Sequence, residues 1–204
     1  MKFRHMLKTG IVLLSLLNSL PGKAQDGSDA FSMRHPRFSI STNLLYDMIE
    51  MPSVGVEVAL GGPVSLAAHG AYNWFPESFW YENVRIATID VEARYWLSKN
   101  RADVMRRGQH LGVYGGTYRY DFYFGHKGEQ ANRNWGGGIS YGYTAEVMSR
   151  LSIDFTIGVG YVGGNYKSYE YIDDEYQHFV WTANKIRHYF GPTKAEISFI
   201  WHIF

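Results

Sequence analysis

Residues 151–166 read LSIDFTIGVGYVGGNY, and most of this stretch alternates strictly between two kinds of residue. From Leu151 to Tyr161 the odd-numbered positions are apolar or aromatic, whereas the even-numbered positions are Ser, Asp, Thr or Gly. A period of two residues is typical of a β-strand whose two faces meet different environments. The stretch therefore predicts a long strand with one apolar face and one face of small or acidic residues.

Comparable patterns recur along the chain, and with the first stretch they predict eight strands. The other seven segments are Phe38–Tyr46, Ser53–Leu60, Val64–Phe75, Val84–Leu97, His110–Phe124, Asn134–Val147 and Thr193–Phe204. Several exceed the usual soluble strand of about 5–6 residues and are long enough to cross a bilayer, which takes about 9–11 tilted residues. Strands in lipid must pair all their backbone groups and so close into a barrel. We therefore predict an all-β fold: an eight-stranded, antiparallel, up-and-down transmembrane β-barrel.

The alternation leaves one alternative open, a soluble barrel of lipocalin type with its apolar face turned inward. The small and acidic residues of the polar face favour the membrane arrangement, because they fit a narrow barrel interior better than a water-facing surface. The pattern is out of phase in His110–Phe124, and a bulge near Gly115-Gly116 would explain that.

Composition excludes several classes of protein. The net charge is +1 and no dense basic run occurs, so nucleic acid is not an expected partner. The absence of cysteine excludes disulfides, thiolate metal sites and lipoprotein attachment. Aromatic residues make up 17% of the chain, as would suit aromatic girdles at the two membrane interfaces.

The N-terminus resembles an export signal. Lys2, Arg4 and Lys8 precede the short apolar run 11–20, and Gly22 and Ala24 stand where a signal peptidase expects small residues. We predict a signal peptide over 1–24 that is cleaved after Ala24, a short segment over 25–37, and the barrel over 38–204. The expected location is the bacterial outer membrane. An N-terminal anchor helix is the alternative, but the apolar run is too short to span a bilayer.

Turn lengths set the predicted topology, because transmembrane barrels have short periplasmic turns and longer outer loops. With both termini in the periplasm, the inner turns are Gly61–Pro63, Ser98–Gln109 and Met148–Arg150. The predicted outer loops are Asp47–Pro52, Pro76–Asn83, Gly125–Arg133 and Gly163–Lys185.

The polar faces of the predicted strands carry charges that would meet inside the barrel. These residues are Glu57, Asp90, Glu92, Arg94, Arg119, Asp121, Glu146, Asp154, Lys194 and Glu196. Because an unpaired buried charge is costly, we expect an ion-pair network that fills the interior. The excess of acids leaves a narrow, cation-preferring channel as the alternative.

The longest predicted outer loop is rich in aromatic residues, which could bind a glycan or a protein or simply pack on themselves. They are Tyr166, Tyr169, Tyr171, Tyr176, Phe179 and Trp181. An outer-leaflet lipid-modifying enzyme would need a histidine near the outer rim, and His126 and His178 are the candidates. No catalytic motif accompanies them, so we expect neither catalytic residues nor a bound cofactor or metal.

Several stretches resemble a domain-of-unknown-function family of small outer-membrane β-barrels from Bacteroides-type bacteria. They are TNLLYD at 42–47, VEARYWL at 91–97, GVYGGTYRYDF at 112–122, LSIDFTIGVGYVGG at 151–164 and GPTKAEIS at 191–198. The resemblance covers residues 38–204 and implies an eight-stranded outer-membrane barrel. Members are often encoded near surface-fimbria components, which implies a role in cell-surface assembly or adhesion.

These observations together predict a non-enzymatic outer-membrane barrel that serves surface assembly, anchoring or partner binding through its outer loops. The expected partners are outer-membrane lipid and cell-surface or fimbrial proteins. A channel and a lipid-modifying enzyme are the alternatives.

Overall fold

The structure, a computed structural model, describes residues 38–73, 84–97, 107–124, 127–172 and 178–203. All of them belong to one compact unit, Arg34–Phe204. The predicted signal peptide, the segment 25–37 and the predicted loop Pro76–Asn83 lie outside the described residues.

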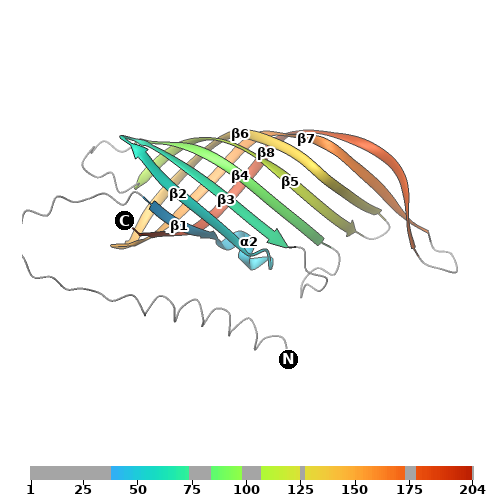
Figure 1. Ribbon diagram of the computed structural model, residues 1–204, viewed down its shortest axis with the longest axis horizontal. Coiled ribbons are helices and arrows are strands. Elements are labelled where there is room, and N and C mark those ends of the chain that lie inside the picture. The colour runs from blue at the N-terminus through green and yellow to red at the C-terminus, as the bar shows by residue number, and fades with distance from the viewer. Residues whose placement is uncertain (1–37, 74–83, 98–106, 125–126, 173–177, 204) are drawn as a thin grey trace, which may run out of the picture. The chain divides into compact units, whose positions relative to one another are not determined.

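Eight strands make up almost all of the described chain. They are β1 (Phe38–Asn43), β2 (Ser53–Gly61), β3 (Val64–Asn73), β4 (Val84–Trp96), β5 (Gly108–Phe124), β6 (Lys127–Met148), β7 (Leu151–Ile172) and β8 (His178–His202). Each strand pairs antiparallel with the next, and β8 returns to pair with β1, where Ser39 lies opposite His202. The sheet therefore closes into a ring, and the prediction of eight antiparallel strands in sequence order is confirmed (Figure 1).

The polarity of this ring is inverted relative to a water-soluble protein. The largest fully buried side chains include His110, Glu92 and Asp154, and every one of them is polar or charged. The outward positions of the same strands carry apolar side chains, of which Ile157 is 68% and Val113 is 65% exposed. The lipocalin-type alternative places apolar residues inside and does not match this arrangement.

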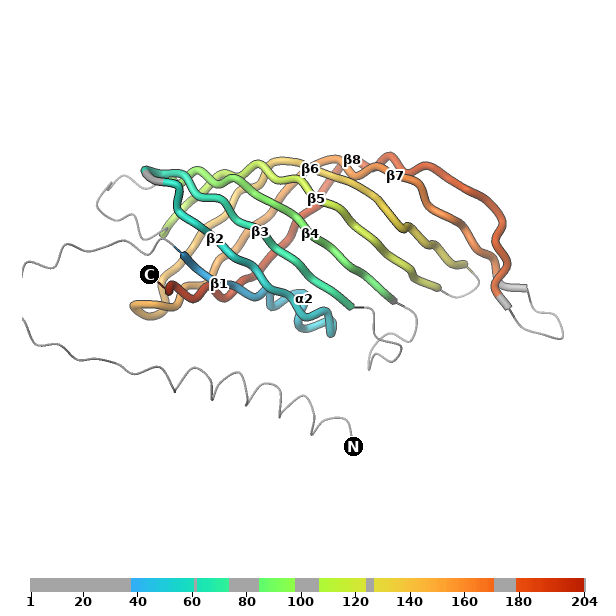
Figure 2. Tube along the Cα trace, in the orientation of Figure 1, coloured from blue at the N-terminus to red at the C-terminus, as the bar shows by residue number. Residues whose placement is uncertain are grey.

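The strands on one side of the ring are much shorter than those on the other side. Strand β1 has 6 residues and β2 has 9, whereas β7 has 22 and β8 has 25. The long strands run far beyond the ends of the short ones and curve as they do so (Figures 1 and 2). We refer to the projecting parts of three strands, residues 127–133 of β6, 163–172 of β7 and 178–190 of β8, as the extension.

Two predicted outer loops prove to be strands of this extension. The described residues of the segment Gly163–Lys185 instead continue β7 to Ile172 and begin β8 at His178, and Tyr166 lies opposite Lys185. The segment Gly125–Arg133 is likewise mostly strand, because β6 already begins at Lys127. The glycines and tyrosines of these segments suggested loops, but the backbone ladder of neighbouring strands holds the described ones extended.

The first strand is shorter than predicted. It ends at Asn43, whose side chain accepts a hydrogen bond from the backbone N–H of Leu45 and so begins the short helix α2 (Leu44–Met48). Asp47 then binds both the backbone N–H and the hydroxyl of Ser53, which ties the helix to the start of β2. Among the described residues, no helix has the length and apolarity needed to cross a bilayer.

Strand β5 shows why its phase could not be assigned from the sequence. Its pairing with β6 is regular through Gly115 and Gly116, so the predicted bulge is not there. The irregularity lies between Tyr118 and Tyr120, where Arg119 alone stands opposite two residues of β6, Asn132 and Arg133.

Candidate functional site

Arg94 occupies the middle of the buried interior. Its Nε and Nη2 donate to Glu92 Oε2 at 3.0 and 2.9 Å, and its Nη1 lies 3.3 Å from Glu57 Oε2. Asp154 and Glu196 approach the same guanidinium at 4.0 and 3.9 Å. Four strands therefore direct carboxylates at one arginine, whose fork of five donors suits such an arrangement.

Lys194 supplies the second buried cation. Its Nζ donates to Asp90 Oδ1 and to Glu92 Oε2, each at 3.0 Å, and lies 3.5 Å from Glu196 Oε1. It also lies 5.1 Å from the ring centroid of Tyr114, within cation–π range. Glu92 thus bridges Arg94 and Lys194, and the two cations share one network with five carboxylates.

The close fit of this network depends on small neighbours. Gly112 of β5 lies next to the network, and a Cβ there would collide with Glu92 Oε1 and Ser140 Oγ. Ser140 donates to that same Glu92 oxygen. Gly112 therefore leaves room for a charged side chain from another strand.

Asp154 is the centre of a second, adjacent group of hydrogen bonds. Its Oδ1 lies 2.9 Å from His110 Nε2 and accepts a bond from the Thr144 hydroxyl at 2.5 Å, and its Oδ2 accepts one from Thr156 at 2.7 Å. The ring of His110 packs at 4.7 Å from that of Trp96. These bonds satisfy a carboxylate that is fully buried.

The helix α2 contributes a tyrosine next to the charged interior. The phenol of Tyr46 lies near enough to Glu196 and Asp90 to be affected by their charges. Burial, with a smaller effect of the charges of Glu196 and Asp90, raises the pKa of Tyr46 to about 12. Tyr46 therefore remains a neutral hydroxyl beside the acid-rich network.

The structure brings together most of the residues that were expected inside. Seven of the ten join the two connected groups: Glu57, Asp90, Glu92, Arg94, Asp154, Lys194 and Glu196. The other three do not. Asp121 is buried elsewhere, where it accepts a hydrogen bond from Gln130.

Arg119 and Glu146 depart from the expected interior placement, because both side chains are exposed. In β5 the even-numbered residues His110 and Tyr114 are the buried ones, so Arg119 takes the outward phase. Glu146 lies near the end of β6, where its carboxylate accepts a bond from Arg107 at 2.6 Å.

Sequence reasoning missed the interior histidines. His110 binds Asp154, His69 lies 3.5 Å from Asp90, and His202 lies 2.9 Å from both Ser39 and Ser152. The alternation along each strand could have revealed them, since each histidine occupies a position on the polar, inward face of its strand. The two histidines predicted as candidates for a lipid-modifying enzyme cannot be compared with this arrangement. His126 and the side chain of His178 lie outside the part of the chain that the structure describes.

One triad of ligand-type residues lies in the network, although no metal was expected. Ligand atoms of His69, Glu92 and Glu196 all lie within 4.8 Å of one another. The ammonium of Lys194 already lies 3.0 Å from Glu92 and 3.5 Å from Glu196. We therefore assign this place to the ion-pair network, because a cationic side chain already supplies its positive charge.

Five of the six aromatic residues expected on an outer loop belong to strands of the extension. Tyr169 and Phe179 both pack against Tyr123, at 6.2 and 4.5 Å between ring centroids, and Trp181 is 55% exposed. The ring of Tyr166 lies 4.8 Å from the guanidinium of Arg187, which also pairs with Glu129. Tyr176 and the side chain of Tyr171 lie outside the described residues.

Comparison with known proteins identifies one family. The sequence model described as "Protein of unknown function (DUF3575)" matches residues 11–203. Neither the curated proteins nor the solved structures contain a match to this chain.

Proposed function

The chain belongs to the family "Protein of unknown function (DUF3575)", and we propose that it is an outer-membrane β-barrel without catalytic activity. In this proposal the barrel anchors the extension at the cell surface, where the extension binds a protein of the cell surface or of a fimbria. The predicted signal peptide over 1–24 provides the export that this location requires.

The observation that carries the proposal is the inverted polarity of a closed sheet. An outward face with Ile89 at 66%, Val113 at 65% and Ile157 at 68% exposure would be costly in water but is expected in lipid. Within the closed ring each strand also pairs with a neighbour on both sides, as strands in lipid require. Exposed aromatic residues such as Tyr72, Trp135 and Tyr95 would form the interfacial girdles.

A buried interior favours a closed barrel over the channel alternative. Ions would have to pass Arg94, which is 3% exposed and is surrounded by carboxylates from four strands. Glu92 and Asp154 are fully buried. We therefore assign the charges of the interior to structural support of the barrel.

Heat-modifiability tests the membrane proposal. We expect protein extracted from the outer-membrane fraction to migrate faster on a detergent gel when unheated than after boiling, because a closed sheet with paired backbone groups resists detergent. The measurement is gel mobility with and without boiling, combined with membrane fractionation. Protein that stays in the soluble periplasmic fraction and migrates identically in both lanes would contradict the proposal.

The extension is the proposed binding surface because it combines exposed aromatic residues with an anchored backbone. Trp181 is exposed, and Ile186 and Phe190 of the same strand are 67% and 80% exposed. The guanidinium of Arg187 lies 5.4 Å from the ring centroid of Tyr120 and 4.8 Å from that of Tyr166. It also pairs with Glu129, so that β8 is linked to β5, β6 and β7. A rigid sheet that displays large apolar side chains fits the usual composition of protein-binding hot spots.

Trimming the extension tests this role. Tyr166 and Lys185 lie directly opposite each other, so residues 167–184 can be replaced by an Asn-Gly turn that closes the two strands. We expect the trimmed protein to keep its heat-dependent gel shift and to lose cross-linking to other envelope proteins on intact cells.

The matched control replaces the turn residues Ser149 and Arg150 by Asn-Gly at the opposite end of the ring, where we expect cross-linking to be unchanged. Cross-linking that survives removal of residues 167–184 would show that this distal part of the extension, which carries Trp181, is not the binding surface.

A further inference from the structure

The outward surface of the ring carries a groove of about 420 Å³ that crosses β2 to β6. Its sides are large apolar residues, among them Tyr72 and Ile89, which are 53% and 66% exposed. Between them the groove runs over Gly70 and Ala87. It is concave because Ala87 stands directly between Tyr72 of β3 and Arg119 of β5 in the cross-strand row.

One end of this groove is basic. Arg119, Asn132 and Arg133 line it, and all three side chains are exposed. The bulge described above brings them together, since Arg119 alone stands opposite both residues of β6. Two guanidinium groups at the end of a largely apolar groove match an anionic ligand that has an apolar part.

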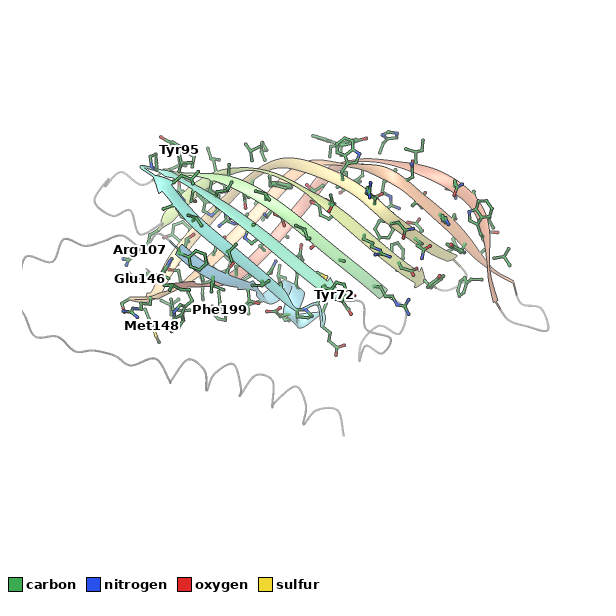
Figure 3. The ribbon with its side chains drawn as sticks, viewed as in Figure 1. Tyr72, Tyr95, Arg107, Glu146, Met148 and Phe199 are labelled. Carbon is green, nitrogen blue, oxygen red and sulfur yellow. The ribbon has the colours of Figure 1, made fainter. Side chains whose placement is uncertain are left out.

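The groove lies toward the end of the ring that we assign to the outer leaflet. Figure 3 shows Tyr72 at the end of the ring opposite to Arg107, Glu146 and Met148. The two groups of residues belong to opposite ends of the ring, because β3 ends at Asn73, whereas β6, which runs in the opposite direction, ends at Met148 in a short turn. The arginines thus lie near the level where headgroups would meet the proposed aromatic girdle.

We infer that this groove binds one lipid of the outer leaflet through its phosphate headgroup, an inference that rests on the proposed membrane location. An acyl chain would lie over Gly70 and Ala87 between Tyr72 and Ile89. Arg119 and Arg133 would hold the phosphate, for which the guanidinium fork is well matched. In a bilayer this surface faces lipid, and charge complementarity selects the anionic phosphate-bearing kind.

A substitution at Gly70 can fill the groove without disturbing the residues that line it. A Cβ at Gly70 would meet nothing closer than the Thr88 carbonyl oxygen, at 3.8 Å, and the backbone there has no positive φ. Gly70→Leu therefore occupies the space proposed for the acyl chain and leaves both arginines in place.

Native mass spectrometry of the detergent-solubilised full chain tests the inference, with dioleoylphosphatidylglycerol as the titrated probe. We expect one lipid to bind the wild type more tightly than any further lipid. The double variant Arg119→Gln/Arg133→Gln should bind that lipid at least about tenfold more weakly, because it loses two charge-assisted contacts. Gly70→Leu should also weaken it.

The matched control is Arg107→Gln/Arg150→Gln, which removes the same charge at the other end of the ring and should leave the first lipid unaffected. Equal weakening by both double variants would indicate general charge attraction and would overturn the site. Unchanged binding in Gly70→Leu would overturn the acyl groove. Heat-modifiability of the same samples separates these outcomes from failure of the membrane proposal itself.

Discussion

Arg94→Met should lower the free energy of unfolding by about 3–5 kcal/mol, the usual cost of leaving a buried charge without its partner. The guanidinium is the shared partner of carboxylates from four strands, and its side chain is 2% exposed. The measurement is urea unfolding of the vesicle-inserted protein, followed by the fluorescence of its tryptophans.

Two further variants make that result specific. Glu57→Gln combined with Arg94→Met removes one of the carboxylates that the loss of the guanidinium leaves without its cation. The double variant should therefore recover part of the lost free energy of unfolding. Arg107→Met removes an arginine from the exposed pair with Glu146, in which the side chains are 38% and 30% exposed, and should cost less than about 1 kcal/mol. Equal losses in Arg94→Met and Arg107→Met would contradict a supporting role for the interior network.

The regular parts of the ring could be predicted because each strand there has two distinct faces. Along β4, Asp90, Glu92 and Arg94 alternate with apolar residues, and the structure places all three in one ion-pair network. The same holds for Asp154 in β7. Where each face of a strand meets one uniform environment, the two-residue period is sufficient to predict which residues point inward. The inward residues of β4 and β7 could therefore be read from the sequence.

The rest could not be predicted because the pattern ceases to be informative where both faces meet a similar environment. In the extension, Trp181 and Phe190 are exposed together with polar neighbours, so no alternation marks these residues as strand. Shifts of register near Tyr118 and Ser168 reverse the phase without any glycine or proline to announce them. Arg119 was misplaced for this reason, and the groove beside it could not be anticipated.

The outward face yields the second large effect. Ile157 lies near the middle of the stretch of β7 that would cross the bilayer, counted from Leu151 over the about 9–11 residues that a tilted strand needs. Ile157→Arg places a charge at that depth and should lower the free energy of unfolding in vesicles by about 2–4 kcal/mol. The measurement is the same urea unfolding experiment.

Ile186 provides a control with the same side chain and nearly the same exposure, 67% against 68% for Ile157. It lies on the extension, opposite Asn165 and well beyond the spanning residues of β8. Ile186→Arg should therefore change the free energy of unfolding by no more than about 0.5 kcal/mol, as for an ordinary surface substitution. If both faces met water, the two substitutions would have the same small effect. A large loss for Ile157→Arg alone requires that the middle of the ring faces lipid while the extension faces water, and a small loss at both positions would refute the membrane-spanning arrangement.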